Sequence, residues 1–121
     1  MKDNMNTLTT LSGNKRLFAA PSVLTEPKSV LTNWRVFECS WHHGKSKTIH
    51  FIGDVNDISG RVTSSIKSFK SDLMIGVSNS GREYELSGPS GFSLSAEEVW
   101  EDWQMHFGAP EVKEITKKYE L

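Results

Sequence analysis

The sequence predicts an α+β domain in which a twisted antiparallel sheet of about five strands packs against one C-terminal amphipathic helix. Segments in which apolar and polar residues alternate recur between residues 34 and 86, and short polar turns separate them. A pattern with helical periodicity follows over residues 95–107. Strands that come first and a helix that comes last are typical of the α+β class.

The first 32 residues differ in composition from the rest of the 121-residue chain. They are rich in Thr, Asn and Ser, and Pro21 and Pro27 disfavour a long helix. We therefore expect an N-terminal extension over residues 1–32, flexible or draped over the domain, and a single α+β domain over residues 33–121. A short apolar patch at residues 17–20 could anchor the extension to the core or to a partner.

The first two strands are predicted over residues 34–41 and 48–55. The first carries apolar side chains on both faces, so we expect both faces to be covered. The second alternates between apolar and polar residues. The polar segment between them, residues 42–47, contains Gly44 and predicts a hairpin turn.

Three further strands are predicted before the helix. Residues 61–69 alternate, although they are polar for a core strand. Residues 72–86 contain two strands around a tight turn, in which Gly81 can adopt the left-handed backbone that a three-residue loop requires. Five sequential strands joined by short turns predict a meander. The right-handed twist of such a sheet can curl it toward a small open barrel.

The predicted helix begins at Ser95, which suits an N-cap and has Glu98 three residues later to complete a capping box. Its apolar residues fall within one arc of the helix: Ala96, Val99, Trp100, Trp103 and Phe107. We expect this face, with its two indoles, to be an internal lid over the sheet. Gly108 and Pro110 end the helix. Residues 112–121 form either an edge strand or a helical turn, and periodicity does not decide between the two.

Charge and cysteine content narrow the class of protein. The formal net charge is −1 and the isoelectric point is about 6.4, which does not favour nonspecific binding to nucleic acid or membranes. Residues 71–121 nevertheless carry ten acidic and four basic side chains. Cys39 is the only cysteine, so no intramolecular disulfide can form. We find no apolar run typical of a signal peptide or a membrane span, and we expect a cytoplasmic protein.

The histidines of the first hairpin are candidates for metal binding. His42, His43 and His50 lie close in sequence, and three such ligands would suit zinc. Adjacent strand residues point to opposite sides, however, and no second cysteine or carboxylate has the spacing of a metal site. We expect no metal and no cofactor, and ligation by these three histidines is the open alternative.

Cys39 is the only candidate thiol nucleophile. Such a nucleophile needs a histidine base within hydrogen-bond reach, and His50 could face Cys39 across the hairpin. The aromatic neighbours Phe37 and Trp41 favour a buried, inert thiol instead. The carboxylates form no clear acid–base pair, and residues 88–91 lack the spacing and the lysine of a phosphate loop. We therefore do not expect an enzyme.

Three short segments carry a resemblance to known sequences: residues 60–66 (GRVTSSI), residues 80–89 (SGREYELSGP) and residues 96–100 (AEEVW) followed by Trp103. They resemble a small uncharacterised bacterial family of hypothetical proteins, some of which are associated with integron gene cassettes and other mobile DNA. The similarity covers roughly residues 34–103. It implies a bacterial, cytoplasmic accessory protein, and it brings no activity, ligand or catalytic residue.

The leading hypothesis is a non-enzymatic binding or accessory protein that acts through a protein partner or its own homodimer. The contact residues we expect are Trp34, Trp41, Arg61 and Lys67. One alternative is a small β-barrel that binds single-stranded nucleic acid, because basic side chains lie beside aromatic ones on the predicted sheet. Another alternative is a small-ligand-binding protein or an enzyme with a pocket in the curved sheet.

Overall fold

The structure is a computed structural model that describes residues 8–10, 17–56 and 59–120. Within these residues the chain forms nine strands of a single sheet, one α-helix and one short 3-10 helix. The strands are β1 (Leu8–Thr10), β2 (Leu17–Ala19), β3 (Lys28–Trp41), β4 (Ser46–Val55), β5 (Ser59–Val62), β6 (Ile66–Lys70), β7 (Ile75–Ser78), β8 (Glu83–Leu86) and β9 (Glu111–Glu114). The helices are α1 (Leu94–Phe107) and η2 (Thr116–Lys118).

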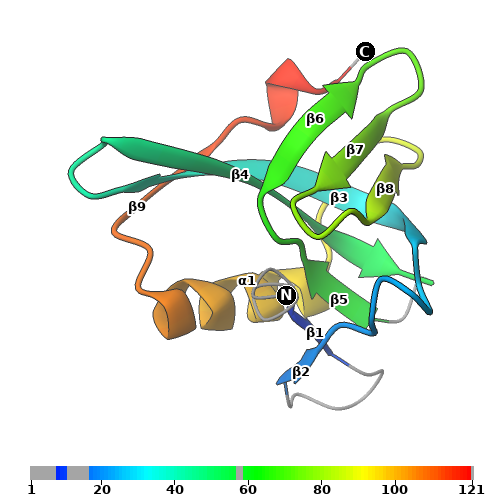
Figure 1. Cartoon of the computed structure of the whole chain (residues 1–121), viewed down its shortest axis with the longest axis horizontal. Helices are drawn as coiled ribbons and strands as arrows, with labels where there is room; N and C mark the ends of the chain where they lie inside the picture. Colours follow the sequence, from blue (N-terminus) through cyan, green and yellow to red (C-terminus); the bar gives the residue numbers. More distant parts are fainter. Residues whose placement is uncertain (1–7, 11–16, 57–58, 121) are drawn as a thin grey trace.

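The strands follow the order β2-β1-β5-β4-β3-β8-β7-β6, and β9 pairs with β3 beside this path (Figure 1). Strand β8 lies parallel to β3, and the other pairs are antiparallel. The predicted α+β class with a mostly antiparallel sheet is therefore confirmed. The prediction of about five strands in a meander is wrong, because more strands form and β3 lies between β4 and β8. Among the described residues, β2 and β6 do not pair with each other, so the sheet is open.

Part of the predicted N-terminal extension pairs with the sheet. Strand β1 pairs with β2 and β5, and β3 begins at Lys28, where it runs beside β8. Residues 1–7 and 11–16 of the extension lie outside the described residues. The start of β3 has its partner much later in the chain, so no local pattern of residues 28–33 reveals it.

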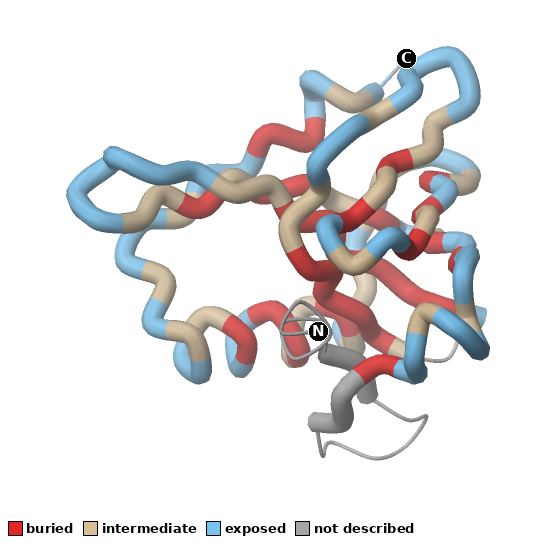
Figure 2. Tube along the Cα trace, viewed as in Figure 1, coloured by how far each residue is buried: buried red, intermediate tan, exposed pale blue. Residues whose placement is uncertain are grey.

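The hairpin of β3 and β4 is the centre of the sheet. Its register shifts between Thr32 and Arg35, which marks a β-bulge. Gly53 lies beside this irregularity, and a Cβ atom there would lie 2.9 Å from the Thr32 carbonyl oxygen. Both faces of the hairpin are covered, as the sequence predicts. Figure 2 shows buried residues in the middle of the hairpin and exposed residues at its tip.

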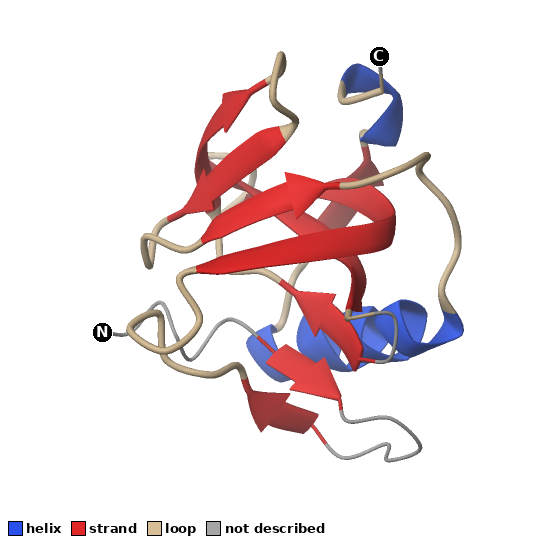
Figure 3. Cartoon of the chain, turned by 90° about the vertical axis from the view of Figure 1, so that its right-hand side faces the viewer, coloured by secondary structure: helices blue, strands red, loops and turns tan. Residues whose placement is uncertain are grey.

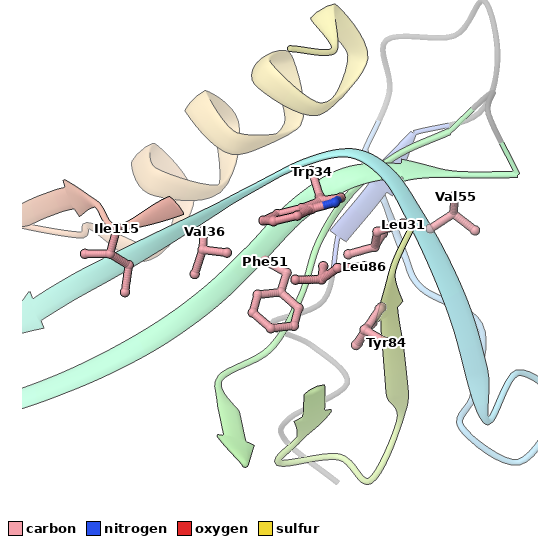
Figure 4. Close-up of a cluster of buried hydrophobic side chains, with 8 residues drawn as sticks. All are labelled: Leu31, Trp34, Val36, Phe51, Val55, Tyr84, Leu86 and Ile115. Atoms are coloured by element: carbon pink, nitrogen blue, oxygen red, sulfur yellow. The ribbon is translucent and has the colours of Figure 1, made fainter. Parts of the chain in front are cut away.

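Two hydrophobic cores form on the hairpin. The core under α1 contains Phe37, Cys39, Ile52, Val62, Val99, Trp100 and Trp103. The second core contains Leu31, Trp34, Val36, Phe51, Val55, Tyr84, Leu86 and Ile115. Figure 4 draws this second core between the hairpin and β8.

The predicted strand over residues 61–69 is two strands, because the chain turns between its two pairing partners. Strand β5 pairs with β4, whereas β6 pairs with β7. Thr63 stabilises the turn between β5 and β6, because its backbone N–H donates to the Phe51 carbonyl and its hydroxyl accepts from the Phe51 N–H. Thr63 and Ser64 are therefore buried at the turn, whereas Lys67 and Ser68 are exposed on β6.

Helix α1 begins at a different serine from the predicted one. Ser93 is the N-cap, and its hydroxyl accepts a hydrogen bond from the Ala96 N–H. The same hydroxyl donates to the Asp54 carboxylate at the end of β4. The Ser95–Glu98 capping box is therefore wrong, because the anchor that fixes the helix start lies on a distant strand.

The body of α1 matches the prediction. Trp100 and Trp103 are 2% and 1% exposed, which confirms them as internal residues. Gly108 ends the helix with a left-handed φ of 65°. Gly60 of β5 allows close approach, because a Cβ there would lie 2.4 Å from the Ser95 carbonyl oxygen. In the described part of the chain, no helix has the length and apolar character needed to span a membrane.

The C-terminal segment contains both of the predicted alternatives. Strand β9 pairs with the end of β3, and η2 follows it. Figure 3 shows α1 on one side of the sheet and η2 on the other. Ile115 of this segment enters the second core.

Candidate functional site

A cavity of about 330 Å³ opens between the outer part of the β3–β4 hairpin and the C-terminal half of α1. Its lining contains five aromatic or imidazole rings, from β3, the turn after it, β4 and α1, together with three hydroxyl side chains. The lining residues are Trp41, His42, Ser46, Thr48, His50, Ser65, Trp103 and Phe107. We call this cavity the hairpin pocket.

The register of the hairpin explains why these residues meet. Trp41 pairs with Ser46, Cys39 with Thr48, and Phe37 with His50. Alternate residues of a strand point to the same face, so these three pairs share the face that α1 covers. The helix ends at Phe107, and the pocket lies where its last turns face the outer part of this hairpin.

Aromatic rings form the wall of the pocket. The Trp103 ring stacks on Trp100 with centroids 5.4 Å apart, and it lies 4.6 Å from the His50 ring. Trp41 meets Trp103 edge-on at 6.2 Å, and Phe107 lies 5.0 Å away from Trp103. Trp103 therefore belongs to the core and also contributes to the pocket wall.

A chain of hydrogen bonds fixes the polar side of the pocket. The Thr48 hydroxyl lies 2.8 Å from the Trp41 indole nitrogen and 2.8 Å from His50 Nε2. The indole N–H can only donate, so the Thr48 oxygen accepts from it. Its own proton is then available for His50 Nε2.

The opposite nitrogen of His50 completes the chain. Nδ1 lies 2.8 Å from the Thr63 carbonyl oxygen, which can only accept, so Nδ1 carries the proton. Burial lowers the pKa of His50 to about 4, although the bond to Thr63 opposes this shift. At neutral pH the ring is therefore uncharged, with Nε2 as an acceptor for Thr48.

Cys39 is buried and does not form a nucleophilic dyad with His50. Burial raises the pKa of its thiol to about 11, an effect that Thr48 opposes and Glu38 increases. Because both ring nitrogens of His50 already have partners, the imidazole has no free position to accept a proton from the thiol. The expected inert thiol fits this arrangement.

Two of the three candidate metal ligands, His42 and His50, line the same pocket, and His43 does not. His42 lines the hairpin pocket and His43 is exposed, and both occupy the left-handed backbone of the turn with φ values of 53° and 59°. His50 is buried with both nitrogens engaged. Among the described residues, no three His, Cys, Asp or Glu side chains form a group suited to a metal ion.

The four predicted contact residues lie in different environments. Trp34 is 2% exposed, and its indole N–H donates to the Gly88 carbonyl. Trp41 is half-buried in the pocket wall. Arg61 is buried against Glu26, whereas Lys67 is exposed on β6. Only Trp41 of this set belongs to the hairpin pocket.

Sequence reasoning missed Thr48, Ser46, Ser65 and the dual role of Trp103. Alternation does place Thr48 on the face of His50, and extending the same pattern by two residues adds Ser46. The position of Ser65 depends on the turn between β5 and β6, and no local sequence pattern predicts that turn. No protein-family model matches this chain, and comparisons with curated proteins and with solved structures likewise found no significant match.

Proposed function

We propose that this protein binds a small, uncharged and partly aromatic molecule in the hairpin pocket. The observation that carries the proposal is the lining, in which aromatic walls combine with hydroxyl groups and no carboxylate, ammonium or guanidinium. Ligand sites are typically apolar cavities of about 300–1,000 Å³ with a few placed polar groups. The volume of about 330 Å³ lies at the small end of this range.

The size and polarity of the pocket limit the ligand. A dry cavity of about 150 Å³ can hold one benzene ring, so this pocket has room for about two fused rings. The neutral His50 ring provides no charge for an anion or a cation. Ser46 and Ser65 provide hydroxyl groups for a polar substituent.

A fluorescent probe tests this proposal. Prodan, a naphthalene dye with small substituents, is uncharged and becomes brighter in apolar sites, so we expect saturable binding that indole displaces. Ser65→Phe should fill the pocket and weaken dye binding at least ten-fold. The matched control is Ser68→Phe, at an exposed position of β6, which should bind the dye like the parent protein. Absence of saturable binding, or equal binding by both variants, would overturn the proposal.

A protein partner or a homodimer is the second candidate. Three apolar side chains on or beside α1 are more than half exposed, namely Phe92 (64%), Leu94 (65%) and Met105 (80%). Leu94 and Met105 are eleven positions apart, which places them on one side of the helix. Sedimentation at micromolar concentration tests the homodimer. We expect Met105→Glu to dissociate a dimer, and a strictly monomeric parent protein would contradict self-association.

Binding of single-stranded nucleic acid has weaker support. Arg61 is paired with Glu26 in the interior, and Phe51 is fully buried, so neither contributes to a surface. Lys67 and Lys70 remain exposed on β6. Retention on single-stranded DNA that decreases with salt would support this function, and no retention at low salt would exclude it.

A further inference from the structure

A second cluster of functional groups lies away from the hairpin pocket. Arg61 of β5 and Arg82, just before β8, are buried, with side chains 3% and 1% exposed. Both guanidinium groups bind the carboxylate of Glu26, which belongs to the segment between β2 and β3 and is 23% exposed. We call these three side chains the arginine cluster.

The Glu26 carboxylate is held by several donors at once. Its Oε2 atom accepts from Arg61 Nη1 at 2.7 Å, from Ser29 Oγ at 2.8 Å and from Arg82 Nη1. Its Oε1 atom accepts from Arg61 Nη2 at 3.3 Å. Burial raises the pKa of Glu26, but the hydrogen bond and charge of Arg61, the hydrogen bond from Ser29 and the charge of Arg82 together lower it overall.

The charges in this cluster do not balance. Two arginines face one carboxylate, which leaves one net positive charge among these buried side chains. Within the ranges that the structure describes, no second carboxylate pairs with these two arginines, and positive charge that is removed from water without a matching anion is costly. A carboxylate carries a single negative charge, so it cannot neutralise both arginines.

Among the described residues, further buried polar atoms in and beside the cluster lack a hydrogen-bond partner of good geometry. The Nε atoms of Arg61 and Arg82 are buried without a hydrogen bond, and the hydroxyl of the fully buried Tyr84 also lacks a partner in good geometry. The Arg61 guanidinium acts on the Tyr84 phenol by its charge and as a nearby hydrogen-bond donor, so the two groups lie close together. The cluster therefore offers more donors than the two oxygens of Glu26 use.

The segment that carries Glu26 is attached by few buried groups. Pro21, Ser22, Thr25 and Pro27 are exposed, and Leu24 is 93% exposed. Ala20 is its one buried apolar residue, and its other contacts to the sheet include the Arg82 bond to the Pro21 carbonyl and the Glu83 N–H bond to the Pro27 carbonyl. An anion could therefore compete with Glu26 without disrupting a large apolar contact.

We propose that Arg61 and Arg82 form a phosphate-binding site, and that Glu26 occupies this site as an internal competitor until a phosphate group displaces it. A phosphate monoester carries a charge of about −1.5 to −2 at neutral pH and has three acceptor oxygens. This charge matches two guanidinium groups, and these oxygens can use both arginines and Ser29 together. The proposal concerns a site separate from the hairpin pocket.

Phosphate titration of the full chain tests this proposal. Calorimetry and thermal unfolding are measured with inorganic phosphate at constant ionic strength, with chloride as the balancing anion. Glu26→Gln removes the internal competitor and keeps the shape of the side chain, so it should bind phosphate at least ten-fold more tightly than the parent protein. The matched control is Glu83→Gln, which removes the carboxylate of a surface pair with Lys28 and should bind like the parent.

A second measurement applies if Glu26→Gln does not fold in chloride. Phosphate should then restore its folding, and the Glu26 and Ser29 amide resonances of the parent protein should shift saturably with phosphate. A parallel titration with glycerol phosphate shows whether the site accepts an ester or only the free ion. The proposal is overturned if phosphate has no saturable effect beyond that of chloride on the parent and on Glu26→Gln, or if Glu83→Gln gains as much affinity.

Discussion

His50 Nδ1 lies 2.8 Å from the carbonyl oxygen of Thr63, and this contact fixes the tautomer of a buried imidazole. The ring is 2% exposed, and no carboxylate is among the groups that affect its protonation. The Trp103 ring lies against it, and the Thr48 hydroxyl occupies the other nitrogen. Protonation would place an uncompensated charge against the wall of the hairpin pocket.

The free energy of unfolding should therefore depend on pH through His50. The folded pKa of about 4 is below the ordinary value of 6.5 for histidine, so the unfolded chain binds the proton more readily. The stability that the neutral His50 ring contributes is fully present above pH 6.5 and is lost as the pH falls toward 4. The free energy of unfolding should decrease by about 3 kcal/mol over this range. Urea unfolding across this range should show the loss in the parent protein. In His50→Gln the loss should be smaller by this amount, and equal pH profiles would contradict the prediction.

Thr48→Val tests the hydrogen-bond chain. The substitution keeps the shape of the side chain but leaves the Trp41 N–H and His50 Nε2 without their partner. We expect a loss of about 1–3 kcal/mol in the free energy of unfolding. Thr48→Ser retains the hydroxyl and serves as the control in the same urea titrations. If valine is tolerated as well as serine, the hydroxyl does not stabilise the fold.

Gly60→Ala tests the approach of α1 to β5. The added Cβ would meet the Ser95 carbonyl oxygen and the Ala96 nitrogen at 2.4 and 2.7 Å, and both atoms belong to backbone that cannot rotate away. We expect a destabilisation of about 1–3 kcal/mol by thermal or urea unfolding. Gly91→Ala is the control, because its Cβ would meet Asn33 Oδ1 at 3.4 Å. Similar losses in both variants would argue against close packing at Gly60.

Ser93 and Asp54 should stabilise the protein as a pair. Ser93→Ala removes the N-cap and should cost about 1 kcal/mol. Because the Ser93 hydroxyl also donates to Asp54, the double variant with Asp54→Ala should cost less than the sum of the single variants. A double-mutant cycle in urea measures this coupling. Ser95→Ala is the control and should have little effect, whereas a larger loss there would restore Ser95 as the cap.

The sequence predicted those elements whose signals are local. The arc of Trp100 and Trp103 and the stop at Gly108 identify α1, and the turn around Gly44 identifies the central hairpin. The cap was misplaced by two residues because Asp54, which selects Ser93, lies 39 positions away. Strand β1 and the start of β3 were missed because their partners, β5 and β8, come much later in the chain.

The candidate site was predicted only in part for the same reason. The residue types of His50 and Trp41 make both of them candidates. The sequence indicates a metal ligand or a base for Cys39 in the case of His50, and a partner contact in the case of Trp41. Thr48, which joins the two, is an ordinary strand residue until the hairpin register is known. Arg61 was expected in a contact with a partner, and its pairing with Glu26 depends on a fold of the N-terminal segment that periodicity does not reveal.

The divided edge of β3 has a consequence for the order of folding. Strand β8 pairs with one end of this edge and β9 with the other, while the Val36 N–H between them donates to Thr116 Oγ1, 80 positions later. During synthesis, part of this edge must wait for the C-terminal segment to leave the ribosome. Contacts between residues far apart in the sequence slow folding. Until β9 covers it, the exposed edge of β3 can pair with another chain. Refolding should therefore be fastest and most complete in dilute solution.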